Sequence, residues 1–306
     1  MKVPAVILIG ALVLLAGCSR PAPPPLPPAP PLEYLGEWGT RGDGPGELSM
    51  PLSMATDATG LVYIADAGSG FIHKFDAQGH PRLSFSEAGL ERATGIAVDR
   101  GGAIYVADYS RDRILVFFPD GERLREIRGG PERRFAGPVG VAVDDDGNFF
   151  VVEFDAHRIQ KFNPRGAFVK AWGRDGNGPG EFHFPVGVAV GPDRFLYVAD
   201  THNRRIEKFT GDGEFIVAWG SPGTASDQMD DVTGLAVSDK YVFVADSGNH
   251  RISVWTLNGR HVLTDDLQGR LRAELETPTA VALGPRGELL VLDPVGPRVL
   301  RFRINF

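Results

Sequence analysis

Hydrophobic positions along this chain alternate in short β-branched runs bounded by glycine and do not follow helical spacing. Six similar runs each end at an acidic residue: Asp66, Asp108, Glu153, Asp200, Asp246 and Asp293. Differences between these positions range from 42 to 47 residues. Short strands repeated at a period in the forties are typical of a propeller. The pattern predicts an all-β fold, a six-bladed β-propeller of four-stranded antiparallel blades.

Each repeat divides into four predicted strands. The innermost strand, residues 139–143 in the third repeat, contains small residues where six blades crowd the axis. The second strand precedes the acidic residue, and the third, such as residues 158–162, alternates buried Ile and Phe with polar side chains. A glycine-containing turn then leads to an outer strand, predicted at residues 168–172 and 215–219.

The sixth repeat ends at Phe306 before its outer strand. A matching segment stands at the other end of the repeats, because residues 34–39 (Tyr-Leu-Gly-Glu-Trp-Gly) parallel residues 215–220 (Phe-Ile-Val-Ala-Trp-Gly). We therefore predict that the N-terminal strand completes the last blade and closes the ring, which leaves no exposed central edge.

The first 32 residues differ from the repeats. An apolar run at residues 6–16 follows a charged start and is too short to cross ~30 Å of hydrocarbon, as in a signal peptide. It leads into Leu-Ala-Gly-Cys18, which resembles the bacterial lipobox, whose cysteine is diacylated; an ordinary signal peptide with an accidental cysteine is the alternative. We predict a signal peptide at 1–17, a lipidated Cys18 with a proline-rich linker at 18–32, and the propeller at 33–306.

Charge and residue usage limit location and partners. Cys18 is the sole cysteine, so disulfides are excluded. Eight prolines among residues 21–32 predict an extended spacer. Ser19 resembles an outer-membrane sorting signal, which gives an expected location at the outer membrane, facing the periplasm and held by the lipid. The net charge of −7, with scattered Lys and Arg, argues against a nucleic-acid partner.

The segments 38–48, 172–182 and 199–206 resemble NHL repeats. The resemblance covers residues 34–306 and implies a propeller, a fold that carries many unrelated activities.

Five repeats place an arginine five residues after the acid, whereas the first has Phe71 there. The pairs are Asp108–Arg113, Glu153–Arg158, Asp200–Arg205, Asp246–Arg251 and Asp293–Arg298. Rows of carboxylates can indicate metal or acid–base chemistry. Because catalytic residues rarely recur once per blade, we interpret the pairs as structural bridges between the second and third strands.

The propeller also resembles peptidyl-amidoglycolate lyase, whose zinc histidines come largely from the start of the innermost strands. The corresponding residues here are Leu52, Thr94, Val139, Val186, Thr233 and Thr279. None of them is a zinc ligand, and the three threonines are weak donors for the axial calcium of related lactonases. We therefore predict no catalytic residue, metal or cofactor. A metal-dependent lyase or lactonase remains the alternative, and His157, His202 and His250 are expected in exposed loops.

Loops between second and third strands usually open on the ligand face of a propeller, together with the blade linkers. The candidate ligand-face residues are Tyr109, Arg111, Phe154, His157, His183, His202, Arg204, Asn249 and His250, with Arg133 and Arg134 from a linker. Aromatic and arginine side chains are common interface anchors. The sequence thus favours a binding or scaffold module of the cell envelope, with a protein, peptide or glycan as its partner.

Overall fold

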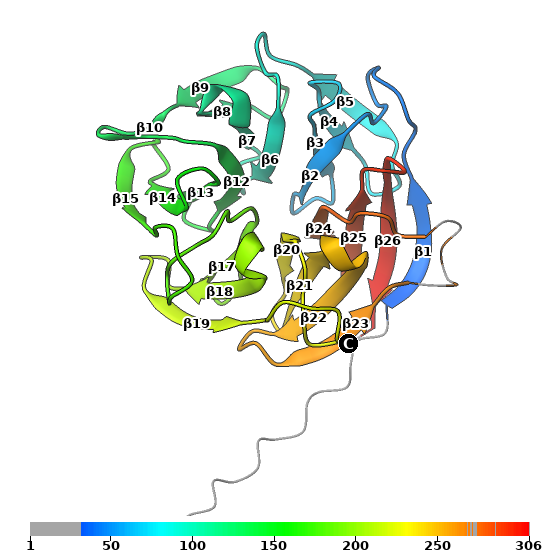
Figure 1. Ribbon diagram of the computed structural model, residues 1–306. Coiled ribbons are helices and arrows are strands. Elements are labelled where there is room, and N and C mark those ends of the chain that lie inside the picture. The colour runs from blue at the N-terminus through cyan, green and yellow to red at the C-terminus, as the bar shows by residue number, and fades with distance from the viewer. Residues whose placement is uncertain (1–31, 268, 270, 272–273, 285, 306) are drawn as a thin grey trace, which may run out of the picture.

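Six four-stranded antiparallel sheets surround a central axis in the computed structural model (Figure 1). The structure describes residues 32–305, except 268, 270, 272, 273 and 285. The predicted all-β, six-bladed architecture is confirmed. A short hairpin of β10 (Gly129–Gly130) and β11 (Arg133–Arg134), which the repeat pattern does not predict, extends the linker between blades 2 and 3.

In blades 1 to 5 the strands follow chain order from the axis outward. Blades 1 and 2 contain β2 (Pro51–Thr56), β3 (Val62–Asp66), β4 (Ile72–Phe75), β5 (Pro81–Phe85), β6 (Ala93–Val98), β7 (Ile104–Asp108), β8 (Arg113–Phe117) and β9 (Arg123–Ile127). Blades 3 and 4 contain β12 (Pro138–Val143), β13 (Phe149–Glu153), β14 (Arg158–Phe162), β15 (Phe168–Trp172), β16 (Val188–Val190), β17 (Leu196–Asp200), β18 (Arg205–Phe209) and β19 (Phe215–Trp219). Blade 5 contains β20 (Val232–Val237), β21 (Tyr241–Asp246), β22 (Arg251–Thr256) and β23 (His261–Asp265).

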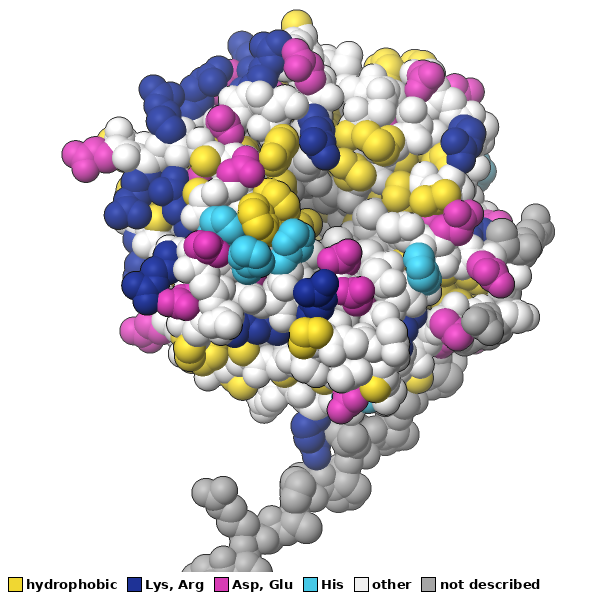
Figure 2. Space-filling view, viewed as in Figure 1, with side chains coloured by type: hydrophobic (Ala, Val, Ile, Leu, Met, Phe, Trp, Pro, Cys, Tyr) yellow, Lys and Arg dark blue, Asp and Glu magenta, His cyan; other side chains and the backbone are white. Residues whose placement is uncertain are grey.

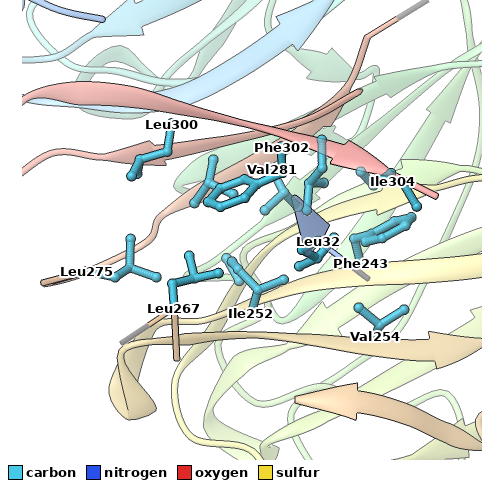
Figure 3. Packing of buried hydrophobic residues seen from close by; sticks show 14 of the residues in the cluster. Leu32, Phe243, Ile252, Val254, Leu267, Leu275, Val281, Leu300, Phe302 and Ile304 are labelled. Atoms are coloured by element: carbon cyan, nitrogen blue, oxygen red, sulfur yellow. The ribbon is translucent and has the colours of Figure 1, made fainter. Parts of the chain in front are cut away.

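Blade 6 is built from both ends of the ring: β24 (Ala280–Leu283), β25 (Glu288–Asp293), β26 (Arg298–Ile304) and, outermost, β1 (Leu32–Trp38). Strand β1 pairs antiparallel with β26 from Leu32 opposite Ile304 to Trp38 opposite Val299. Leu32 is 3% exposed and packs with Phe243 and Phe302 between blades 5 and 6 (Figure 3). The predicted closure of the ring is confirmed.

Glycine is required where innermost strands of neighbouring blades touch. A Cβ on Gly187 would lie 1.8 Å from the carbonyl oxygen of Thr233, and one on Gly95 would lie 2.4 Å from that of Val139. Real Cβ atoms do not approach a backbone this closely, so a side chain at these positions would push the blades apart. The small residues therefore set the radius of the ring.

Three single-turn 3-10 helices join second to third strands: η1 (Tyr109–Arg111), η2 (Thr201–Asn203) and η3 (Ser247–Asn249). The acid that ends the second strand is fully buried in all six blades, and in five of them it pairs with the arginine five residues later, as in Asp200–Arg205 at 2.8 Å. The other four pairs measure 2.7 to 3.0 Å.

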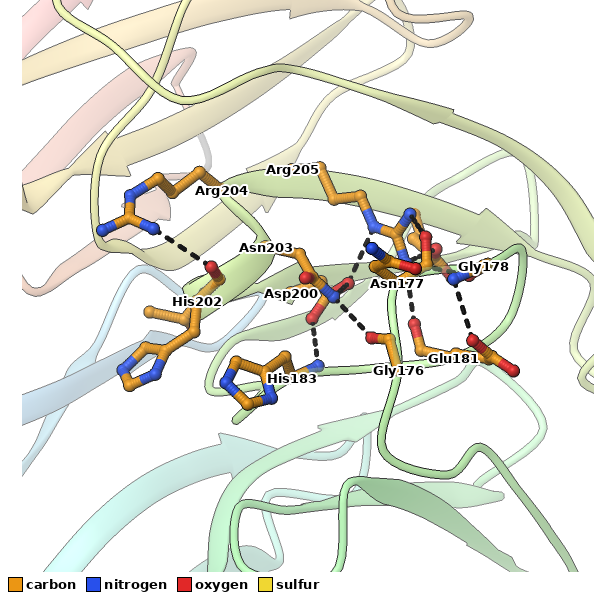
Figure 4. Close-up of polar contacts among 12 residues, drawn as sticks. Gly176, Asn177, Gly178, Glu181, His183, Asp200, His202, Asn203, Arg204 and Arg205 are labelled. Atoms are coloured by element: carbon orange, nitrogen blue, oxygen red, sulfur yellow. Dashed lines mark hydrogen bonds and ion pairs between the residues drawn. The ribbon is translucent and has the colours of Figure 1, made fainter.

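Asp200 also accepts the backbone N–H of His183 from the linker between blades 3 and 4 (Figure 4). In blade 1, where Phe71 replaces the arginine, Asp66 accepts the amides of Ser49 and Met50. The predicted bridges between second and third strands are present in all five pairs, and Asp200 and Asp66 also tie their own blades to the preceding linkers.

The apolar run at 6–16, Cys18 and residues 19–31 of the proline-rich linker lie outside the described residues, and Leu32, the last residue of the predicted linker, belongs to β1. Within the described part of the chain, no helix has the length and apolar character needed to span a membrane.

Candidate functional site

The six positions at the start of the innermost strands meet around the axis, as their equivalence in the sequence suggests. They line one pocket of about 250 Å³ together with Arg92, Tyr109 and Phe154. The complete ring is Leu52, Thr94, Val139, Val186, Thr233 and Thr279. Most of the lining is apolar, and the pocket opens on the face that carries the loops between second and third strands. Figure 2 shows this central hollow, with apolar side chains at its edge.

Hydroxyl groups in the ring differ in what they contact. Thr94 Oγ1 lies within donating distance of the carbonyls of Ala107 and Pro138, at 3.3 and 3.2 Å. Thr233 Oγ1 lies 2.7 Å from the hydroxyl of Ser247. Thr279 Oγ1 is buried and has no hydrogen-bond partner among the described residues. Burying an unsatisfied hydroxyl costs free energy, and this oxygen is closed to solvent.

Below this pocket the axis narrows to a space of about 80 Å³. The side chains of Met54, Ile96, Val141 and Leu235 from the innermost strands contribute to its walls.

The rim of the pocket combines an arginine with an aromatic ring. The guanidinium carbon of Arg92 lies 5.0 Å from the centre of the Tyr109 ring, a cation–π distance. The Tyr109 hydroxyl donates to Asp155 at 3.2 Å. Burial and the Asp155 carboxylate raise the pKa of Tyr109, which keeps the phenol neutral and its ring available for stacking.

Three of the predicted ligand-face histidines gather beside Phe154 on the same face, where Figure 2 shows a cyan cluster. The His183 ring lies 5.7 Å from that of His157 and 5.6 Å from that of His202. The expectation that all loop histidines are exposed is wrong for His157, whose side chain is 15% exposed. Its Nδ1 accepts the backbone N–H of Phe184 at 3.1 Å, and its ring packs on the Phe184 ring at 4.5 Å. His202 and His250 are exposed as expected.

Asp175 completes this cluster, although the sequence analysis did not select it. Its Oδ1 lies 2.8 Å from Nδ1 of His183 and 3.7 Å from Nδ1 of His157. The hydrogen bond from His183 lowers the pKa of Asp175, so the carboxylate is ionised at neutral pH. In the sequence Asp175 stands in a glycine-rich loop, and no local pattern links it to a histidine 18 residues earlier.

Other predicted ligand-face residues have structural contacts. Arg204 pairs with Asp230 at 2.5 Å, and Asn249 donates to Asp246 and to the carbonyl of Gly223. Nδ1 of His250 contacts the Glu276 carbonyl oxygen. Arg111 is exposed and pairs with Glu91 at 2.9 Å. Of the nine residues, Tyr109 and Phe154 line the pocket.

The fold defines the class of this protein, a six-bladed β-propeller, and three of its blades carry NHL repeats. The NHL repeat profile matches residues 90–117, 135–162 and 182–209, in blades 2 to 4. No curated protein sequence matches the chain.

Several solved structures share the fold at low identity. A streptogramin B lyase has a TM-score of 0.66 at 15% identity, covering 90% of this chain and 98% of its own. A catalytically inactive histidine-to-alanine variant of virginiamycin B lyase from Staphylococcus aureus, solved with quinupristin, has a TM-score of 0.62 at 16% identity, with 83% and 80% covered. Hydrazine synthase of Kuenenia stuttgartiensis has a TM-score of 0.59 at 12% identity, with 87% and 99% covered. At these identities the likeness concerns the fold alone.

Proposed function

We propose that this protein is a binding module of the cell envelope, whose axial pocket holds an apolar side chain of a peptide segment. The observation that carries this proposal is the pocket of about 250 Å³ bounded by Tyr109 and Phe154. Ligand pockets for drug-sized molecules span ~300–1,000 Å³. The smaller volume suits one anchoring side chain, with the rest of the partner lying across the face.

The rim determines which anchor fits best. Tyr109 and Phe154 offer flat apolar surfaces for an aromatic or branched side chain. Arg92 at the rim favours a neighbouring carboxylate. A segment with an apolar residue next to an acidic one meets both requirements.

The pocket chemistry favours binding over proton transfer. Among the described residues that line it, none is a carboxylate or an imidazole, the groups that general acid–base catalysis uses most often. The structure of virginiamycin B lyase with quinupristin is an example of this fold together with a small molecule.

Panning a random peptide library on residues 19–306 tests the pocket. We expect enriched peptides whose binding weakens at least tenfold with Phe154→Ser. The matched control is Phe118→Ser, because Phe118 is 43% exposed in the turn between β8 and β9, on the opposite face. Enrichment that survives Phe154→Ser but not Phe118→Ser, or no enrichment from peptide or glycan libraries, would contradict the proposal.

We also propose that a lipid on Cys18 anchors the propeller to a membrane, the outer membrane on its periplasmic side, with the proline-rich linker as spacer. The support is the lipobox-like sequence before Cys18 and the composition of residues 18–32. Cys18→Ser should move the protein to the soluble fraction or leave it uncleaved in the inner membrane. Fractionation identical to the wild type would refute the anchor, while leaving the pocket proposal untouched.

A further inference from the structure

The cluster at the junction of blades 3 and 4 contains donor atoms of the kind that transition metals bind. One atom from each of His157, Asp175 and His183 lies within 4.8 Å of the other two. This is the one such group of three among the described residues. We propose that these three side chains bind one zinc-class divalent cation, outside the axial pocket.

The chemistry of the donors fits this class of ion. Two imidazole nitrogens and one carboxylate oxygen are borderline ligands that suit Zn²⁺ and its neighbours, and such a set leaves positions open for water or a ligand atom. Ca²⁺ and Mg²⁺ prefer oxygen ligands throughout and fit this set poorly.

The fold holds one ligand and leaves the others free to adjust. The His157 ring is held by its packing on the Phe184 ring, whereas the side chains of Asp175 and His183 are 65% and 42% exposed. Ligands at ~2.0–2.1 Å from a tetrahedral zinc lie ~3.4 Å from one another. Rotation of the two exposed side chains closes the remaining gap.

Protons now occupy the places that the cation would take. The hydrogen bond between His183 Nδ1 and Asp175 spans 2.8 Å and contains a proton. His157 Nδ1 accepts the Phe184 N–H and so carries no proton of its own, which is the state that a metal ligand requires. Binding at these atoms replaces both hydrogen bonds, and the His183 proton moves from Nδ1 to Nε2, so the imidazole stays neutral.

The ring itself does not require histidines at these positions. The equivalent positions at the junction of blades 4 and 5 hold Arg204, Pro222 and Asp230, where Arg204 and Asp230 form an ion pair. That pair already joins the two blades. The imidazoles at the earlier junction therefore supply a property beyond ring closure, and cation binding accounts for both of them and for Asp175.

The test is zinc binding by a protein of residues 19–306, purified without a polyhistidine tag. This protein contains every described strand and lacks the thiol of Cys18. Equilibrium dialysis with metal analysis should give one equivalent at micromolar zinc. Cobalt(II) should give the visible absorption of a low-coordinate site. Replacing residues that only hydrogen-bond to the ligands of a metal weakens its binding by ~10–100-fold. Replacing a ligand itself, as in His183→Ala or Asp175→Asn, should therefore lower the affinity for zinc at least tenfold.

His250→Ala is the matched control, because His250 occupies the same loop position as His157 two blades later and lies away from the cluster. It should bind zinc as the wild type does. Circular dichroism should show that the variants at the exposed positions 175 and 183 remain folded. Absence of zinc binding by the folded wild type, or equal affinity in wild type, His183→Ala and Asp175→Asn, would overturn the proposal.

Discussion

Glu207 on β18 is a buried carboxyl group in blade 4, and its side chain is fully inaccessible to solvent. Its Oε2 accepts the backbone N–H of Gly180 at 3.1 Å, and its Oε1 lies 2.6 Å from Arg205. Burial raises the pKa of Glu207 to about 8, because the cost of desolvating the carboxylate exceeds the attraction of Arg205. Blade 3 holds a neutral residue at the equivalent position, Gln160, whose Oε1 accepts the Gly130 amide at 3.0 Å.

The raised pKa makes stability depend on pH in a defined direction. The folded protein binds the Glu207 proton more tightly than the unfolded chain, whose carboxyl has the ordinary value of 4.5. The stabilisation from protonation is therefore complete below pH 4.5 and is lost as the pH rises to 8. At about 1.4 kcal/mol per pKa unit, the loss is on the order of 5 kcal/mol across this window. The glutamine variant has no proton to lose.

Urea unfolding at intervals between pH 5 and pH 8.5 measures this effect. The free energy of unfolding of Glu207→Gln, relative to the wild type, should rise by roughly 3–4 kcal/mol over that interval, since all other titrating groups are shared and cancel. The control Glu214→Gln changes an exposed carboxylate and should give a flat difference. A flat or falling difference for Glu207→Gln would show that Arg205 keeps the carboxylate ionised and would refute the reasoning.

Two further predictions concern the ring. Arg251→Met removes the partner of buried Asp246 and the donor to the carbonyls of Thr224, Ala225 and Gln228. Urea unfolding should show that the free energy of unfolding falls by roughly 3–5 kcal/mol. The control Arg165→Met, at an exposed position, should lower it by less than about 0.5 kcal/mol. A small loss for Arg251→Met would show that water replaces the guanidinium. A chain that starts at residue 39 instead of 32 lacks β1 and exposes the edge of β26. Its melting temperature should be at least about 10 °C lower than that of the chain with β1. Equal melting temperatures would mean that the closure does not stabilise the ring.

Most of the fold follows from local signals in the sequence. Alternation, glycine turns and the recurring acid define each blade, and the match between residues 34–39 and 215–220 identifies the closing strand. The acid–arginine pairs are also local, because five residues separate the partners across one turn between strands. The positions that line the axial pocket follow from the repeat, since equivalent residues of a closed ring must meet at its axis.

The parts of the site that the sequence did not predict depend on contacts between blades. His157, Asp175 and His183 come from a strand connection and a linker, and their distances depend on how blade 3 packs against blade 4. The burial of His157 has the same origin, because Phe184, which covers it, lies on the linker to the next blade. The β10–β11 hairpin was missed because it interrupts the repeat and has no counterpart among the described residues of the other linkers.

Pairing of Leu32 with Ile304 places the first and last described strands of the ring next to each other. The six blades thus form a circle in which the position of the chain break is arbitrary. Joining the two ends with a short linker and opening the chain at the exposed turn around Phe118 would give a circular permutant with the same set of strand pairings. Such a permutant would carry its termini on the face opposite the axial pocket, which would allow the propeller to be fused or immobilised with its ligand face free.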